Sequence, residues 1–176
     1  MKQFIFLIGI TLLPFVVDAQ NTNTKTTGNS WMIELGPAVA HPIHYLNMFS
    51  TLGLGLDGAI THPLGNGFAV GVRVNYLYFL GRSADPFFTG GGSHYKHSNL
   101  YDALAEANYR FDNKIVLGIN LGLSVLTFNG HSDPSFAQKA YAGYEWDRGE
   151  HPIVFAAFYE QTDYHKNAGL RATYRF

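Results

Sequence analysis

Four of the eight histidines in this 176-residue chain form two pairs with a spacing that metal sites use. The pairs are His41-x-x-His44 and His94-x-x-His97. Neutral imidazole nitrogens bind borderline metals such as zinc or copper, and each pair offers two of them within one short segment. This spacing is a weak signal on its own, because solvent-exposed loops readily tolerate histidine. We therefore interpret both pairs as solvent-exposed loop histidines and predict no metal and no cofactor.

A second set of residues has the side-chain types that nucleophilic catalysis requires, namely a hydroxyl, an imidazole and an orienting acid. The candidates are His97, Ser98, His131, Ser132 and Asp133, with Glu106 and Glu145 as orienting acids. The histidine and the serine are adjacent in both groups, and adjacent side chains of a β-strand point to opposite faces. This spacing does not favour a catalytic pair, so we predict a protein that is not an enzyme and has no catalytic residue.

Apolar side chains alternate with polar or small ones at every second position in most of the chain. This period is typical of β-strands that present different residues to their two faces. We identify seven such segments, at residues 31–39, 52–60, 68–78, 101–111, 115–125, 139–146 and 168–176, and an eighth strand at 153–162, which is apolar on both faces and places Glu160 inward. The sequence therefore predicts an all-β fold, an antiparallel up-and-down barrel of about eight strands.

Residues 115–132 also allow a different interpretation, because they carry no charge and contain Gly118 and Gly122 in a GxxxG spacing. This motif is common in transmembrane helices. The alternate positions 118, 120, 122 and 124 are Gly, Asn, Gly and Ser, however, and a helix would distribute these residues around its whole circumference. We therefore predict a strand.

The connections between the segments differ in length. We predict short turns at 63–67, 112–114 and 148–152, and longer links at 41–50, 81–98 and 129–138, with a tighter one at 163–166. Short turns at one end and longer loops at the other are typical of membrane barrels. Proline 37 lies within a predicted strand, and a closed barrel has no edge strand to hold a proline, so we expect Pro37 to mark a bulge or the rim.

Aromatic residues lie near the ends of the segments, on the face that carries the apolar side chains. At one end these are Trp31, Phe68, Tyr109, Phe111, Trp146, Tyr174 and Phe176, and at the other Tyr76, Tyr78, Tyr101 and Tyr159. Aromatic rings with a polar tip favour the interface between a bilayer and water. The pattern therefore predicts that the apolar face is turned outward to lipid, as in a transmembrane barrel.

The opposite face would then enclose an interior with six acids and five bases. These are Glu34, Asp57, Asp102, Glu106, Glu145 and Glu160, with Arg73, Arg110, Lys139, Arg171 and Arg175. The interior of an eight-stranded barrel is just wide enough to be filled by side chains. Because buried charges need partners, we predict a lumen closed by ion pairs, with a narrow pore as an alternative.

The N-terminal residues have the pattern of an export signal. A basic Met1-Lys2, an apolar run over 4–17 and small residues before Gln20 predict a signal peptide at 1–19 that is cleaved. Residues 20–29 are polar and predict a flexible tail, and 30–176 predict one barrel domain. The chain has no cysteine, and 12 Lys and Arg against 13 Asp and Glu do not indicate nucleic-acid binding.

The last nine residues, Ala168 to Phe176, carry apolar side chains at alternate positions and end on an aromatic residue. They resemble the C-terminal assembly signal of bacterial outer-membrane proteins, with Leu170, Tyr174 and Phe176 as its main residues. The whole domain resembles the small OmpA/OmpX-type barrels, particularly those of Bacteroidota-like bacteria. The resemblance implies an outer-membrane location, contacts with membrane lipid and lipopolysaccharide, and the barrel-assembly machinery as a partner during insertion.

The resemblance also bears on activity. Some eight-stranded barrels modify lipid A as deacylases or acyltransferases, and the deacylases place His and Ser two residues apart on one strand face. The adjacent His97-Ser98 and His131-Ser132 depart from that pattern. We therefore expect a monomeric, non-catalytic barrel with a structural or surface-interaction role, and the lipid A-modifying enzyme is the alternative.

Overall fold

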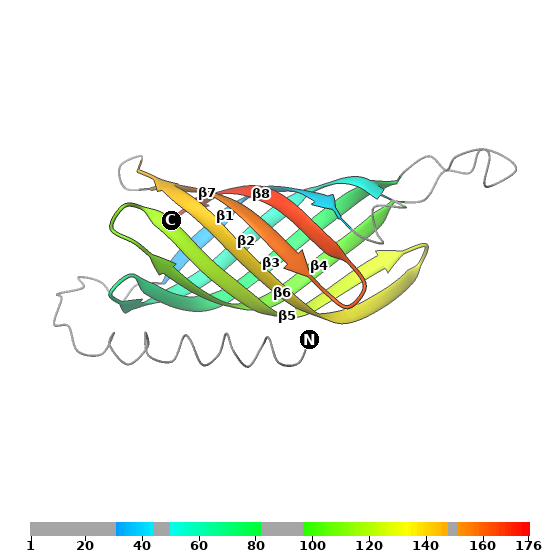
Figure 1. Ribbon diagram of the computed structural model, residues 1–176, viewed down its shortest axis with the longest axis horizontal. Coiled ribbons are helices and arrows are strands. Elements are labelled where there is room, and N and C mark those ends of the chain that lie inside the picture. The colour runs from blue at the N-terminus through cyan, green and yellow to red at the C-terminus, as the bar shows by residue number, and fades with distance from the viewer. Residues whose placement is uncertain (1–30, 44–49, 82–96, 148–150) are drawn as a thin grey trace, which may run out of the picture.

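The computed structural model describes residues 31–43, 50–81, 97–147 and 151–176, which form a closed barrel of antiparallel strands (Figure 1). The strands are β1 (Met32–Pro42), β2 (Ser50–Gly65), β3 (Phe68–Gly81), β4 (Ser98–Arg110), β5 (Ile115–Phe128), β6 (His131–Trp146), β7 (Ile153–Gln161) and β8 (Lys166–Arg175). Each strand pairs with the next in sequence, and β8 pairs with β1. The predicted all-β up-and-down barrel of eight strands is confirmed. The predicted signal peptide (1–19) and tail (20–29) lie outside the described residues.

The strands are strongly staggered around the barrel. A row of paired residues that begins at Ile33 of β1 crosses every strand in turn and reaches Lys166 of β8. The carbonyl of Lys166 accepts a hydrogen bond of 2.8 Å from the backbone N–H of Ile43. The row therefore returns to β1 ten residues beyond its start. A closed barrel needs such a stagger, which tilts its strands against the axis (Figure 1).

Two hairpins turn at an Asn-Gly pair. The φ angles are 49° at Asn66 and 83° at Gly67, and 51° at Asn129 and 82° at Gly130. Positive φ at both central residues is what a type I′ turn requires, and this turn matches the twist of paired strands. The expected short turn at 63–67 is therefore confirmed. The longer link predicted at 129–138 is wrong, because β6 begins at His131, which pairs with Phe128 of β5.

Pro37 lies in the middle of β1 and pairs with Leu56 of β2 without a shift in register, so the prediction that it marks a bulge or the rim is wrong. On its other side, the pairing of β1 with β8 passes from Leu35 to Ala38 without including Gly36 or Pro37. Proline has no N–H to donate. It therefore fits a position where the hydrogen-bond ladder between two strands is interrupted.

Side chains alternate between the wall and the lumen along every strand. The outward positions hold exposed apolar residues, such as Leu56, Leu123 and Leu170, whereas the inward positions are buried. Residues 115–128 form β5, so the strand predicted there in preference to a helix is confirmed. Among the described residues, no helix has the length and hydropathy that a membrane-crossing helix needs.

Candidate functional site: a charged network in the barrel lumen

The structure places most of the charges assigned to the lumen inside the barrel. Ten of the eleven side chains are buried, and these are Glu34, Asp57, Arg73, Asp102, Glu106, Lys139, Glu145, Glu160, Arg171 and Arg175. Arg110 is the exception, because it is the last residue of β4 and its side chain is 39% exposed at the rim. Inward alternation places the charges on seven different strands, which the closed sheet then brings together.

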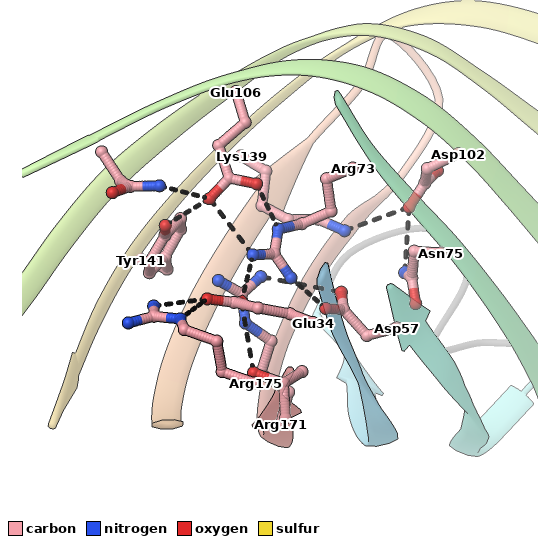
Figure 2. A network of polar contacts seen from close by, with 12 residues as sticks. Glu34, Asp57, Arg73, Asn75, Asp102, Glu106, Lys139, Tyr141, Arg171 and Arg175 are labelled. Carbon is pink, nitrogen blue, oxygen red and sulfur yellow. Dashed lines mark hydrogen bonds and ion pairs between the residues drawn. The ribbon is translucent and has the colours of Figure 1, made fainter. Parts of the chain in front are cut away.

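Arg73 of β3 lies at the centre of the larger group (Figure 2). Its Nη2 donates to Oε2 of Glu34 at 2.9 Å, its Nε donates to Oε2 of Glu106 at 2.7 Å, and its Nη1 donates to Asp57. The planar guanidinium has five donors in a fixed fork, so it can serve several carboxylates at once. Because the three acids come from β1, β2 and β4, one side chain connects four consecutive strands. We call Arg73, Glu34, Asp57 and Glu106 the Arg73 cluster.

The second oxygen of Glu34 extends the Arg73 cluster to the closing strand. Nη2 of Arg175 donates to Oε1 of Glu34 at 2.5 Å, and Arg175 also pairs with Glu145 of β6. Nη2 of Arg110 lies 2.5 Å from Oε2 of Glu145. These ion pairs therefore connect β8 to β1 on one side and to β4 and β6 across the lumen.

Lys139 of β6 organises a second, smaller group. Its Nζ lies 3.1 Å from Oδ2 of Asp102 on β4 and 2.9 Å from Oε2 of Glu160 on β7. Nδ2 of Asn75 donates to the same oxygen of Asp102 at 3.0 Å. Nε2 of His165 lies 3.3 Å from the other oxygen of Glu160. We call Lys139, Asp102, Glu160 and His165 the Lys139 cluster.

Sequence reasoning missed His165, which lies in the link predicted at 163–166, although its side chain is only 1% exposed. The turn after β7 explains the difference, since Oγ1 of Thr162 accepts N–H bonds from Tyr164 and His165 at 3.2 and 3.0 Å. This tight turn directs the imidazole back toward Glu160. The local sequence carries no signal for it, because a threonine before an Asp-Tyr-His segment also fits an open loop.

Tyr141 is a further lumen residue that the alternation placed inward without assigning it a role. Its hydroxyl donates to Oε1 of Glu106 at 2.5 Å, and its ring lies under Arg171, whose guanidinium carbon is 4.0 Å from the ring centre. Nη1 of Arg171 is 3.6 Å from Oδ2 of Asp57, and no nitrogen of its guanidinium has a hydrogen-bond partner in the described structure. Asn120 and Asn167 are buried with both polar atoms unpaired as well. This part of the lumen is where internal water would find polar partners.

The histidine pairs do not assemble into a metal site in the part of the chain that the structure describes. Nδ1 of His41 lies 2.9 Å from the carbonyl oxygen of Thr51, and Nδ1 of His97 accepts the backbone N–H of Gly81 at 3.2 Å. His44 and His94 lie outside the described residues. No described group of three or more His, Cys, Asp or Glu side chains could hold a metal ion.

Among the described residues, no hydrogen bond joins a candidate histidine to a candidate serine. Oγ of Ser98 is buried and lies 3.2 Å from Oγ of Ser50, while Oγ of Ser132 lies 3.1 Å from Oγ1 of Thr127. Each of these serines therefore contacts another hydroxyl. Glu106 and Glu145, the candidate orienting acids, face arginines in the lumen.

The residues of the C-terminal segment occupy the outer wall. Leu170, Tyr174 and Phe176 are all exposed, and the Tyr174 and Phe176 rings pack edge to face with centres 4.9 Å apart. The backbone N–H of Phe176 donates to the carbonyl of Ile33 at 2.9 Å, which holds the chain end against β1. The terminal aromatic residue is therefore part of the barrel surface.

Solved structures of outer-membrane proteins share this fold at low sequence identity. Neisserial surface protein A (NspA) aligns with a TM-score of 0.57 and 15% identity, over 85% of this chain and 98% of that one. The Yersinia pestis outer membrane protein Ail in a phospholipid bilayer nanodisc aligns with 0.53 and 17%, over 85% and 100%. The outer membrane protein OprG from Pseudomonas aeruginosa aligns with 0.53 and 10%, over 83% and 95%. No protein-family model matches the sequence, and no curated protein is significantly similar to it. The predicted resemblance to small outer-membrane barrels is confirmed at the level of the fold.

Proposed function

We propose that this chain is an integral protein of the bacterial outer membrane, with a structural or surface-interaction role and no catalytic activity. The observation that carries the proposal is the distribution of charge over the two faces of the sheet. Ten charged side chains are buried in the lumen, while apolar residues such as Leu56 and Leu123 are exposed on the wall. A soluble barrel would have the opposite arrangement, and a lipid-facing wall has this one.

The filled lumen supports a structural role over transport. The Arg73 cluster joins side chains of β1, β2, β3 and β4, and the Lys139 cluster joins side chains of β4, β6 and β7 to His165, with contacts between 2.7 and 3.3 Å among those given above. Side chains that are bound to one another across the lumen obstruct a continuous water path. We therefore infer a barrel that does not conduct ions.

The likeness in fold to NspA, Ail and OprG supports the proposed location. The proposal includes export by the signal peptide at 1–19 and recognition of Leu170, Tyr174 and Phe176 by the barrel-assembly machinery. In the membrane, the wall would contact lipid and lipopolysaccharide. Because the sheet closes on itself and leaves no full strand edge to pair, we propose a monomer.

Gel migration of the outer-membrane fraction tests the proposal. The full chain is expressed in a Gram-negative host, the membranes are fractionated, and each fraction is run with and without boiling. A membrane barrel keeps its structure in detergent until it is heated, so the protein should be found in the outer membrane and migrate differently after boiling. A soluble protein whose migration does not change on heating would contradict the proposal.

A further inference from the structure

Lys166 differs from every other charged residue in the described strands, because it lies on the outward face of the sheet. It alternates with the buried Asn167 at the start of β8, and every other outward position of the described strands holds an apolar or neutral side chain. Among the described residues no ion pair includes Lys166, and this residue is half-buried. An unpaired cation on a lipid-facing wall is costly at the bilayer centre and tolerated near its surface.

Two glutamines lie beside Lys166 on the same face. Gln138 of β6 pairs in register with Gln161 of β7, and Gln161 pairs with Lys166 of β8. The neighbouring outward row, farther from the β7–β8 turn, consists of Ala140, Tyr159 and Ala168. The wall therefore changes at this row from apolar to polar, with a tyrosine at the boundary, as at a bilayer surface.

A cavity of about 220 Å³ opens at this polar row. It is lined by Phe136, Gln138, Gln161, Lys166 and the turn residues 162–165. The cavity exists because β6 begins at His131, whereas its pairing with β7 begins at Gln138. Figure 1 shows the β5–β6 hairpin projecting past the β7–β8 turn, and the cavity lies in the notch between them.

We propose that this notch binds the phosphorylated headgroup of an outer-leaflet lipid, with Lys166 as the phosphate ligand. The inference rests on the membrane location proposed above. The ammonium group of Lys166 offers three donors, and the amide of Gln138 offers further N–H groups to phosphate oxygens. Charge-assisted hydrogen bonds of this kind are the stronger ones in proteins.

The surroundings of the notch favour a lipid over a free anion. Phe136 and Tyr159 are exposed beside it, so the acyl chains of a bound lipid would lie along the apolar wall. Asp163 lies at the mouth of the cavity with an exposed side chain. Its carboxylate would repel a free phosphate ion, whereas the sugar hydroxyls beside the phosphate of a lipid headgroup would donate hydrogen bonds to it.

Lipid retention by the purified protein tests the site. The full-length barrel is inserted in phosphatidylcholine nanodiscs that contain a few per cent of bisphosphorylated lipid A, and native mass spectrometry counts the lipid A bound after release into detergent. Lys166→Gln should lower the retained lipid A about tenfold, which is the effect expected from losing one charge-assisted hydrogen bond. Dephosphorylated lipid A should not be retained by the wild-type protein.

Lys114→Gln is the matched control, because it removes the same charge from the turn at the opposite end of the barrel. It should retain as much lipid A as the wild-type protein. Equal retention by Lys166→Gln and wild type would overturn the site, and so would displacement of the lipid by millimolar inorganic phosphate. Heat-modifiable migration is measured on every variant. A barrel that inserts yet fails the lipid test contradicts only this inference, whereas a chain that does not insert contradicts the proposed function as well.

Discussion

Arg73 and Arg171 are both buried in the lumen, yet their surroundings are very different. Arg73 donates to three carboxylates from three other strands, whereas Arg171 lies over the ring of Tyr141 and makes no hydrogen bond in the described structure. The lumen therefore contains one region in which charges hold strands together and another in which polar groups are only loosely matched. Stability should depend on the first region far more than on the second.

Removing Arg73 should have the largest effect. Arg73→Met leaves Glu34, Asp57 and Glu106 without their shared cation, and breaking a buried ion pair in this way costs roughly 3–5 kcal/mol. Guanidinium titration of the barrel refolded in detergent micelles measures the free energy of unfolding.

Arg171→Met is the matched control for that measurement. It removes a guanidinium of similar burial that lies over the Tyr141 ring and 3.6 Å from Oδ2 of Asp57 but makes no hydrogen bond, so we expect a smaller loss of about 2 kcal/mol. Equal losses in the two variants would contradict the contrast between the two regions.

Lys139→Met should rank second, with a loss of about 3 kcal/mol. The substitution leaves Asp102 and Glu160 without the ammonium group, but His165 still faces Glu160 and reduces the damage. Chemical denaturation is again the measurement. Adding Asp102→Asn and Glu160→Gln to the variant should recover most of the loss, and no recovery would show that Lys139 acts through packing.

Tyr141→Phe separates the hydroxyl from the ring. It removes only the hydrogen bond to Glu106 and keeps the aromatic face under Arg171, so we expect a loss of about 1–2 kcal/mol. Combining it with Arg73→Met tests coupling, since both residues bind Glu106. Strictly additive losses would contradict a shared network.

Lys114→Gln should have the smallest effect. Nζ of Lys114 lies 2.5 Å from Oδ2 of Asp147 in the exposed turn region, and this carboxylate raises the pKa of Lys114 above its ordinary value of 10.5. A raised pKa means that any stabilisation is complete below pH 10.5 and is lost as the pH rises through the folded-state value. Thermal unfolding at pH 7 should be unchanged, because exposed ion pairs contribute little. A large drop in the unfolding temperature would contradict the claim that stability depends on the ion pairs in the lumen.

The sequence predicts which residues face the lumen better than it predicts which of them meet. Alternation at period two places Glu34, Arg73 and Lys139 on the inward face, and all three are buried. The partners depend on the stagger of ten residues around the sheet, which no local pattern encodes. Arg110 shows the limit of alternation, since its position in the strand points inward but its place at the strand end leaves it partly exposed.

The missed features share a physical cause. His131 to Pro134 have the composition of a loop, but pairing with β5 continues through them. His165 follows a turn whose direction is set by Thr162 hydrogen bonds. Both outcomes depend on contacts that form only in the folded chain. The local composition therefore predicts a loop where the structure has a strand, and it does not predict the burial of His165.

Single-channel recording tests the central claim most directly, namely that paired charges fill a closed barrel. The purified full-length protein is inserted in a planar lipid bilayer, and the current is recorded under applied voltage in molar salt. Because the side chains of Arg73 and Lys139 are bound across the lumen, the wild-type barrel should show no unitary conductance steps. Clear and reproducible unitary steps from the wild-type protein would contradict the account.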